Sequence, residues 1–136
     1  MALIFSIVGG VDLLRAALEG KKTETRRLGA RRWIVGRSYA VKARRTAPGF
    51  CRAVVTAVRQ ERLTEIDQDA VSREGLDCTP DEFCQIFRQL HGLEPSADPL
   101  VWVIQFRMLR FTRGLTTESP YQCIRQGESL EAWLMR

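Results

Sequence analysis

The sequence predicts one α+β domain. Its 136 residues fit a single domain, and 45% of them are hydrophobic, as in an ordinary globular chain. Two long segments, 50–63 and 100–109, are rich in the β-branched and aromatic residues of strands. Other segments have caps and apolar spacings that are typical of three or four short helices. Because no linker or repeat divides the chain, we expect the strands and helices to share one core.

The first third predicts a strand, a short helix and a basic segment. Residues 2–8 form an apolar run, which we expect to be a strand buried on both faces. Asp12 can cap a helix that extends to about residue 19, and Gly20 is suited to end it in the left-handed conformation. The basic segment 21–32 has no apolar period, so we expect a loop or a sheet edge there.

The middle of the chain predicts two strands and a helix. Residues 38–43 alternate in polarity after Gly36, and residues 50–63 have strong β character. Thr64 is expected to cap a helix that runs to about Arg73 and is closed by the glycine at position 75.

A second helix and the most hydrophobic strand follow. Thr79 starts the helix as a cap, with proline and acidic residues in the first turn. Its apolar residues share one face: Phe83, Ile86, Phe87 and Leu90. Trp102 lies within the strand 100–109 and is expected in the core. Residues 129–134 could form a last short helix.

Charge is distributed very unevenly along the chain. The net charge is +5, but ten basic residues and Glu24 give residues 21–45 a charge of +9, and residues 61–84 carry −6. Because dense like charges repel one another, the basic segment favours a phosphate-bearing or other anionic partner. The alternative is a solvated face that the acidic segment of the same fold partly neutralises.

Metal, membrane and export signals are missing from the sequence. The four cysteines form no Cys-x-x-Cys pair, and the single histidine, His91, cannot complete a zinc site of familiar spacing. We therefore expect no metal or other cofactor; Cys51 and Cys84 are interpreted as small buried hydrophobes and His91 as a helix C-terminal residue. No apolar run approaches the ~20 residues of a membrane span, and no secretory signal is recognisable, so a cytoplasmic protein is expected.

The segment Gly-Lys-Lys-Thr-Glu-Thr-Arg-Arg, residues 20–27, is the most informative for chemistry. Ammonium, guanidinium and backbone N–H groups that follow a helix end are the donors that bind phosphate. The segment is not a Walker A loop, because it has one glycine where two are needed. A plain basic surface loop has the same composition, so composition alone leaves both interpretations open.

Together with later motifs, this segment resembles the ASCH domain family of the PUA-like superfamily. The later motifs are Gly36 before a strand, Arg73-Glu74-Gly75, Phe83, Phe87, His91-Gly92, and Val101-Trp102-Val103-Ile104-x-Phe106. The resemblance covers about residues 3–111, with phenylalanine at position 87 where a typical member has tryptophan. It implies a small PUA-like β-barrel of mixed, mostly antiparallel strands in residues 1–111, with 112–136 as a C-terminal extension.

For function, the resemblance implies a cleft that binds RNA or nucleotides. The corresponding binding residues are Lys21, Lys22, Thr23, Thr25, Arg26, Arg27, Arg31, Arg32 and Trp33. One enzymatic branch of the family is an amidohydrolase that deacylates N4-acetylcytidine-type nucleosides, and its reactive residues correspond to Lys22, Thr25 and Glu74. Other members have been proposed to be ribonucleases, and a scaffold that binds an acidic protein is a further alternative.

The residue types are compatible with either catalysis or binding. We expect binding as the main function, because members of the enzymatic branch are typically shorter and lack the Arg31-Arg32-Trp33 segment and the C-terminal extension. A threonine hydroxyl needs a base to become a nucleophile, and a lysine can serve if burial or nearby positive charge lowers its pKa. Glu74 could hold a water, protonate a leaving amine or pair with Lys22, and an ion pair would keep Lys22 protonated. Trp33 could stack on an unpaired base or close one end of the barrel.

Overall fold

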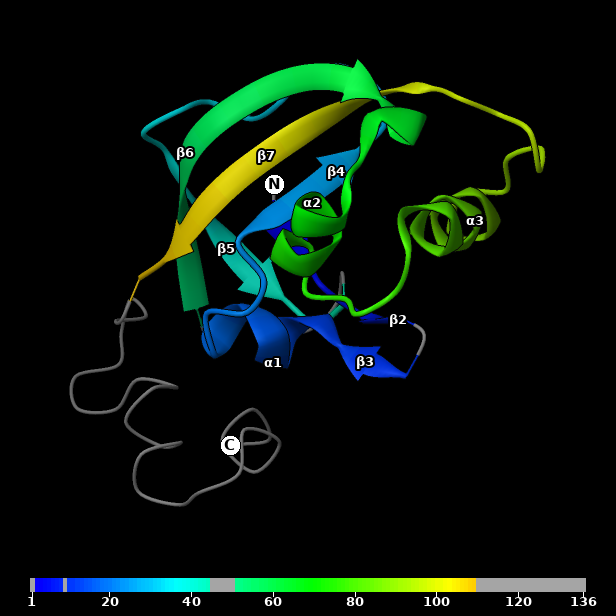
Figure 1. Ribbon diagram of the computed structural model, residues 1–136. Helices are drawn as coiled ribbons and strands as arrows, with labels where there is room; N and C mark the ends of the chain where they lie inside the picture. Colours follow the sequence, from blue (N-terminus) through cyan, green and yellow to red (C-terminus); the bar gives the residue numbers. More distant parts are fainter. Residues whose placement is uncertain (1, 9, 45–50, 110–136) are drawn as a thin grey trace.

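A computed structural model describes residues 2–8, 10–44 and 51–109, and its α+β architecture confirms the predicted fold class (Figure 1). The elements are β1 (Ala2–Ile4), β2 (Ile7–Val8), β3 (Val11–Asp12), α1 (Leu13–Leu18), β4 (Glu24–Arg27), β5 (Ser38–Lys42), β6 (Cys51–Arg62), the 3-10 helix η1 (Leu63–Glu65), α2 (Gln68–Arg73), α3 (Pro80–Leu90) and β7 (Leu100–Met108).

Five strands form one mixed sheet in the order β1-β5-β6-β7-β4. β1 and β5 are parallel and the other pairs antiparallel, as expected for mostly antiparallel pairing. The sheet is strongly curved (Figure 1). Its two edge strands share no backbone ladder within the described residues. A side chain bridges them instead, because Arg27 Nη2 donates to the Ile4 carbonyl at 3.0 Å.

The long strands β6 and β7 support the edge strand that carries the basic motif. Their ladder runs from Ala53–Met108 to Arg62–Leu100, with an irregularity between Val55 and Ala57. β4 pairs with the inner part of β7, and Thr25 lies opposite Ile104. Because Val55, Val103 and Ile104 are fully buried, β4 is attached to a part of the sheet that lies in the core.

The helices begin largely where their caps predict. Asp12 accepts from the Arg15 amide at the start of α1, and Thr79 forms a capping box with Glu82 at the start of α3. The expected cap at Thr64 is wrong. Asp67 caps α2, whereas the Thr64 amide and hydroxyl both donate to the Asp98 carboxylate, so Thr64 fixes a loop.

Two further expectations are corrected by the burial pattern. Residues 2–8 form two short strands, and their burial alternates: Leu3, Phe5 and Val8 are buried, whereas Ile7 is exposed. Trp102 is half-buried because its indole reaches the Gly29 carbonyl at 2.9 Å across the sheet edge. Cys51 and Cys84 are buried as expected. The expected helix at 129–134 and the extension 112–136 lie outside the described residues.

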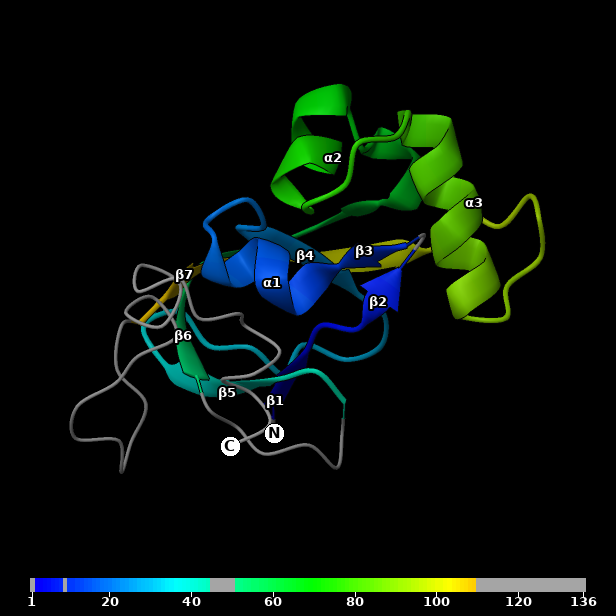
Figure 2. The same ribbon diagram turned by 90° about the horizontal axis from the view of Figure 1, so that it is seen from below.

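The two-stranded sheet β2–β3 lies between α1 and α3 (Figure 2). Within the described part of the chain, no helix is long and apolar enough to cross a membrane. The same part contains no cluster of three or more potential metal ligands.

Candidate active site

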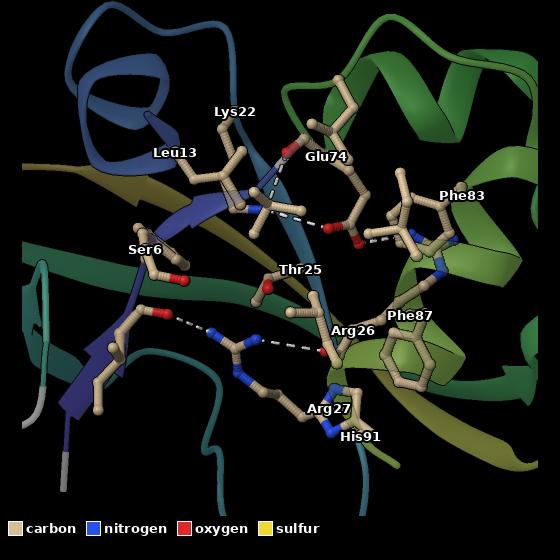
Figure 3. Close-up of a pocket in the computed structure, with 16 residues that line it drawn as sticks. Ser6, Leu13, Lys22, Thr25, Arg26, Arg27, Glu74, Phe83, Phe87 and His91 are labelled. Atoms are coloured by element: carbon tan, nitrogen blue, oxygen red, sulfur yellow. Dashed lines mark hydrogen bonds and ion pairs between the residues drawn. The ribbon is translucent and has the colours of Figure 1, made fainter. Parts of the chain in front are cut away.

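A pocket of about 220 Å³ opens between the segment Ile4–Val8, strand β4 and helix α3 (Figure 3). This is smaller than the roughly 300–1,000 Å³ of sites that hold drug-sized ligands, so the pocket fits a single small ring. Its apolar lining includes Leu76, Phe83 and Phe87, and its polar lining consists of Ser6, Lys22, Thr25, Arg26, Arg27, Glu74 and His91. All three residues of the implied reactive set therefore line one pocket.

Backbone contacts hold the basic motif beside the end of α2. The Thr23 amide donates to the Arg73 carbonyl at 2.8 Å, and the Thr23 carbonyl accepts from the Phe106 amide at 3.0 Å. Thr23 itself is exposed, but its main chain connects β4 to both α2 and β7. This connection places Lys22 against Glu74, 52 residues away in the sequence.

Lys22 is almost completely buried, with a relative exposure of 2%, and its ammonium donates to three oxygens. These are the Glu24 carbonyl at 2.9 Å, the Glu74 carbonyl at 2.9 Å and Glu74 Oε1 at 3.0 Å. Burial lowers the pKa of Lys22, although the Glu74 carboxylate acts to raise it. The amine is therefore held rigidly and is easier to deprotonate than a solvated lysine.

Arg26 holds the other oxygen of the Glu74 carboxylate. Its Nη1 donates to Glu74 Oε2 at 2.9 Å and to Glu24 Oε2 at 2.8 Å, and its Nη2 donates to Glu61 Oε1 at 2.7 Å. Because Arg26 is 2% exposed, these are desolvated, charge-assisted contacts. They bring the predicted basic and acidic segments together inside the molecule, so part of the +9 charge is neutralised internally.

Gly75 permits the close contact between Lys22 and the end of α2. Its φ is +87°, and a Cβ at this position would lie 3.0 Å from Lys22 Cβ and 3.3 Å from Ala16 Cβ. A side chain here would push Lys22 away from the Glu74 carbonyl. The Glu-Gly pair is thus needed both for the turn and for the position of the amine.

Thr25 contributes a hydroxyl group to the pocket wall. Its side chain is buried and points into the cavity from β4 (Figure 3). Its hydroxyl makes no hydrogen bond with any described residue, whereas both Lys22 and Glu74 are fully engaged. A hydroxyl free in this way is available to a ligand.

No family model and no curated protein matches the sequence. Solved structures do match the fold. A protein of family DUF984 from Enterococcus faecalis V583 is 15% identical, with a TM-score of 0.58 over 87% of both chains. An ASCH domain from Lactobacillus crispatus is 17% identical, with a TM-score of 0.52 over 78% of this chain and 79% of the other. The chain has the ASCH-domain fold.

A variant of an ASCH-domain protein from Zymomonas mobilis has the same fold. It is 14% identical, with a TM-score of 0.56 over 93% of this chain and 83% of that one. At these identities the likeness concerns the fold, and the function must be argued from the pocket itself.

Within the ASCH fold, the expected binding residues separate into an internal and an external group. Lys22, Thr25 and Arg26 are buried in the pocket wall. Lys21, Arg31 and Arg32 are exposed, and the Arg31 guanidinium lies 5.9 Å from the Trp102 ring. Trp33 is 6% exposed and packs edge-on against Tyr39 at 5.0 Å between ring centroids. This burial favours the packing alternative for Trp33 over base stacking.

Several contributors to the ASCH-fold pocket were not predicted from the sequence. Ser6 and the aromatic face of α3 line it, and Glu24 and Glu61 hold Arg26 from behind. The sequence does show that Phe83 and Phe87 share one helix face, but this spacing is typical both of a helix packed in the core and of a helix that lines a pocket. The sequence shows Glu24 as the single acidic residue of a basic segment, but it does not predict that Glu24 pairs with Arg26.

Proposed function

We propose that the protein is an amidohydrolase that removes an acyl group from a small N-acylated cytosine-type nucleoside or base. The observation that carries the proposal is the contact between Lys22 and Glu74 in a pocket where the Thr25 hydroxyl has no protein partner. The family resemblance of Lys22, Thr25 and Glu74 points to the same chemistry. The small size of the pocket and its aromatic wall suit a planar ring with a short acyl group.

The proposed reaction proceeds through an acyl-threonine. Thr25 Oγ attacks the amide carbonyl while its proton passes to the neutral form of Lys22, and a C–O bond forms as the carbonyl π bond opens. Collapse of the tetrahedral intermediate breaks the C–N bond, and the Lys22 ammonium returns the proton to the leaving exocyclic nitrogen. Water then hydrolyses the ester, which releases the carboxylic acid and regenerates the Thr25 hydroxyl.

Glu74 acts in this scheme as a positioning residue for Lys22. Its carboxylate is held by Lys22 on one oxygen and by Arg26 on the other, so both its orientation and its charge are fixed. When Lys22 loses its proton, one of its three acceptors loses a hydrogen bond. The amine lone pair then becomes available for the Thr25 proton.

An assay of N4-acetylcytidine hydrolysis, in which chromatography measures the cytidine released, tests this function. Wild type should release cytidine and acetate, and Lys22→Ala, Thr25→Ala and Glu74→Ala should each reduce the rate by at least about a hundredfold. Lys21→Ala is the matched control, because Lys21 is exposed and its one carboxylate partner among the described residues is Glu19, at 3.1 Å. Absence of turnover by folded wild type would contradict the proposal.

A second candidate function is the binding of RNA or a nucleotide outside the pocket. It is favoured by the exposure of Lys21, Arg31 and Arg32, of which the two arginines have no carboxylate partner among the described residues. The logarithm of the binding constant should fall linearly with the logarithm of the salt concentration, with a slope of roughly one per neutralised phosphate. Titrations of labelled RNA at several salt concentrations measure this slope. Salt-independent binding, or none, would exclude this candidate.

A further inference from the structure

The pocket contains one cation that forms no ion pair with a described carboxylate. Lys22 pairs with Glu74 at 3.0 Å, and Arg26 contacts three carboxylates at 2.7 to 2.9 Å. Arg27 lines the same pocket but has no carboxylate within ion-pair distance among the described residues. Buried charges in proteins are generally paired, and the half-buried Arg27 differs in this from its buried neighbours Lys22 and Arg26.

The contacts that Arg27 does make fix its position without offsetting its charge. Its Nη2 donates to the Ile4 carbonyl at 3.0 Å and its Nη1 to the Arg26 carbonyl at 3.3 Å. The guanidinium also lies 5.9 Å from the Phe5 ring. Two main-chain carbonyls therefore orient the group across the sheet edge, and its other N–H donors have no partner in the described part of the chain. Burial lowers the pKa of Arg27, with Glu74 acting in the opposite direction.

His91, at the end of α3, also lines the pocket (Figure 3). Its ring is 4.3 Å from the Phe87 ring, and its pKa is lowered first by burial and then by the positive charge of Arg27. The other charged groups that line the pocket are Lys22, Arg26 and Glu74. The lining therefore has three cations and one carboxylate, next to an imidazole whose pKa is lowered.

We propose that Arg27 is the oxyanion subsite of this pocket, so that the preferred ligand has, besides its planar ring, a carboxylate or phosphate group on its acyl chain or sugar. This inference deepens the proposed function, because it names an acidic substrate class for the same site. A guanidinium with unused N–H donors matches the oxygen atoms of either group. The ring would lie against the aromatic wall of α3, with the charged group towards Ile4 and Arg27.

Binding measurements that involve no turnover test the subsite. Calorimetry on Thr25→Ala compares two neutral probes, cytidine and N4-acetylcytidine, with a phosphate probe, cytidine 5′-monophosphate, and a carboxylate probe, N4-succinylcytidine. At least one anionic probe should bind about tenfold or more tightly than its neutral counterpart. Whichever probe does so identifies the substituent. Equal affinity of neutral and anionic probes, or no binding of either anionic probe, would overturn the proposal.

Substitution of Arg27 should remove this preference selectively. Arg27→Gln is expected to bind the anionic and neutral probes equally, and Arg27→Lys should keep most of the preference because it keeps the charge. Arg37→Gln is the matched control, since Arg37 is exposed outside the pocket lining. Retention of the full preference in a folded Arg27→Gln protein would overturn the proposal.

His91 provides an internal reporter, because it is the single histidine of the chain. Bound anion should raise the pKa of His91, measured by NMR titration of its ring, whereas bound cytidine should leave it unchanged. Arg27→Gln should raise the pKa of His91 without ligand and abolish the effect of the anion. An anion preference without acyl hydrolysis would refute the proposed function alone, and hydrolysis without the preference would refute only the subsite.

Discussion

The Lys22 ammonium and the Glu74 carboxylate lie 3.0 Å apart, with both side chains withdrawn from solvent. Lys22 precedes the edge strand β4, and Glu74 caps the C-terminus of α2. A carboxylate at a helix C-terminus is electrostatically unfavourable by itself, so Lys22 and Arg26 offset both the dipole and the cost of desolvation. The pair therefore connects the stability of the fold to the chemistry of the pocket.

Removing one member of this pair should destabilise the protein strongly. Lys22→Met leaves Glu74 with one fewer cation, and we expect a loss of about 3–5 kcal/mol in the free energy of unfolding, measured by urea denaturation. The Lys22→Met, Glu74→Gln double variant should lose less than the sum of the single variants. Lys21→Met is the control and should cost less than about 1 kcal/mol, because its pair with Glu19 is exposed. Additive losses would contradict direct coupling.

Gly75→Ala should impair both stability and turnover. Alanine at position 75 must adopt a positive φ, and its Cβ would lie 3.0 Å from Lys22 Cβ. This contact should displace the Lys22 amine. Gly29→Ala is a matched control, because Gly29 has a φ of +91° but no atom within 4 Å of the new Cβ. Gly75→Ala should lower the free energy of unfolding by about 1–3 kcal/mol more than Gly29→Ala does, and it should also lower kcat. Equal effects of the two substitutions would show that a Cβ at position 75 does not displace Lys22.

Trp33 should matter for stability and not for nucleic-acid binding. Trp33→Ala removes a buried ring that packs on Tyr39, so we expect a cost of about 3–5 kcal/mol in unfolding free energy. Trp33→Phe should fold and retain wild-type affinity for any RNA that the protein binds, whereas Arg31→Gln should weaken that affinity. A large loss of RNA affinity in folded Trp33→Phe would restore the stacking role.

Stability should rise with pH across the titration range of His91. Its pKa is lower in the folded protein than the ordinary value of 6.5, first because of burial and then because of Arg27. The protonated form is thus disfavoured by folding, and the penalty present below the folded pKa disappears as the pH approaches 6.5. His91→Gln should flatten this part of the pH profile, measured by denaturation at closely spaced pH values. An unchanged slope in His91→Gln would assign the effect to other groups.

Local signals in the sequence were sufficient for most elements. Asp12 and Thr79 cap α1 and α3 as expected, and Gly20 has the predicted positive φ of +78°. The long apolar strands were also predictable, since Val55 and Val103 belong to continuous β-forming segments.

The strand that carries the site was harder to predict. β4 has the sequence Glu-Thr-Arg-Arg, and its first three residues are buried. Distant side chains compensate the charges of Glu24 and Arg26. Glu61 and Gln105 contact Arg26 and Glu24 across 35 and 81 residues, and no local pattern encodes such partners. The family resemblance identified Lys22, Thr25 and Glu74, but their common pocket depends on the tertiary structure. The cap at Asp67 was missed because Thr64 offers an equally good local signal.

The most direct test of the central claim is to mix the protein with N4-acetylcytidine, quench the reaction rapidly, and measure the mass of the intact protein. The account predicts a transient adduct of one acetyl group on Thr25, found by peptide mapping in wild type and lost in Thr25→Ala. Lys22→Arg keeps the positive charge but removes the base, so it should form no adduct. Hydrolysis of the substrate by wild type without any acyl-Thr25, or an undiminished adduct in Lys22→Arg, would contradict the roles given to Thr25 and Lys22.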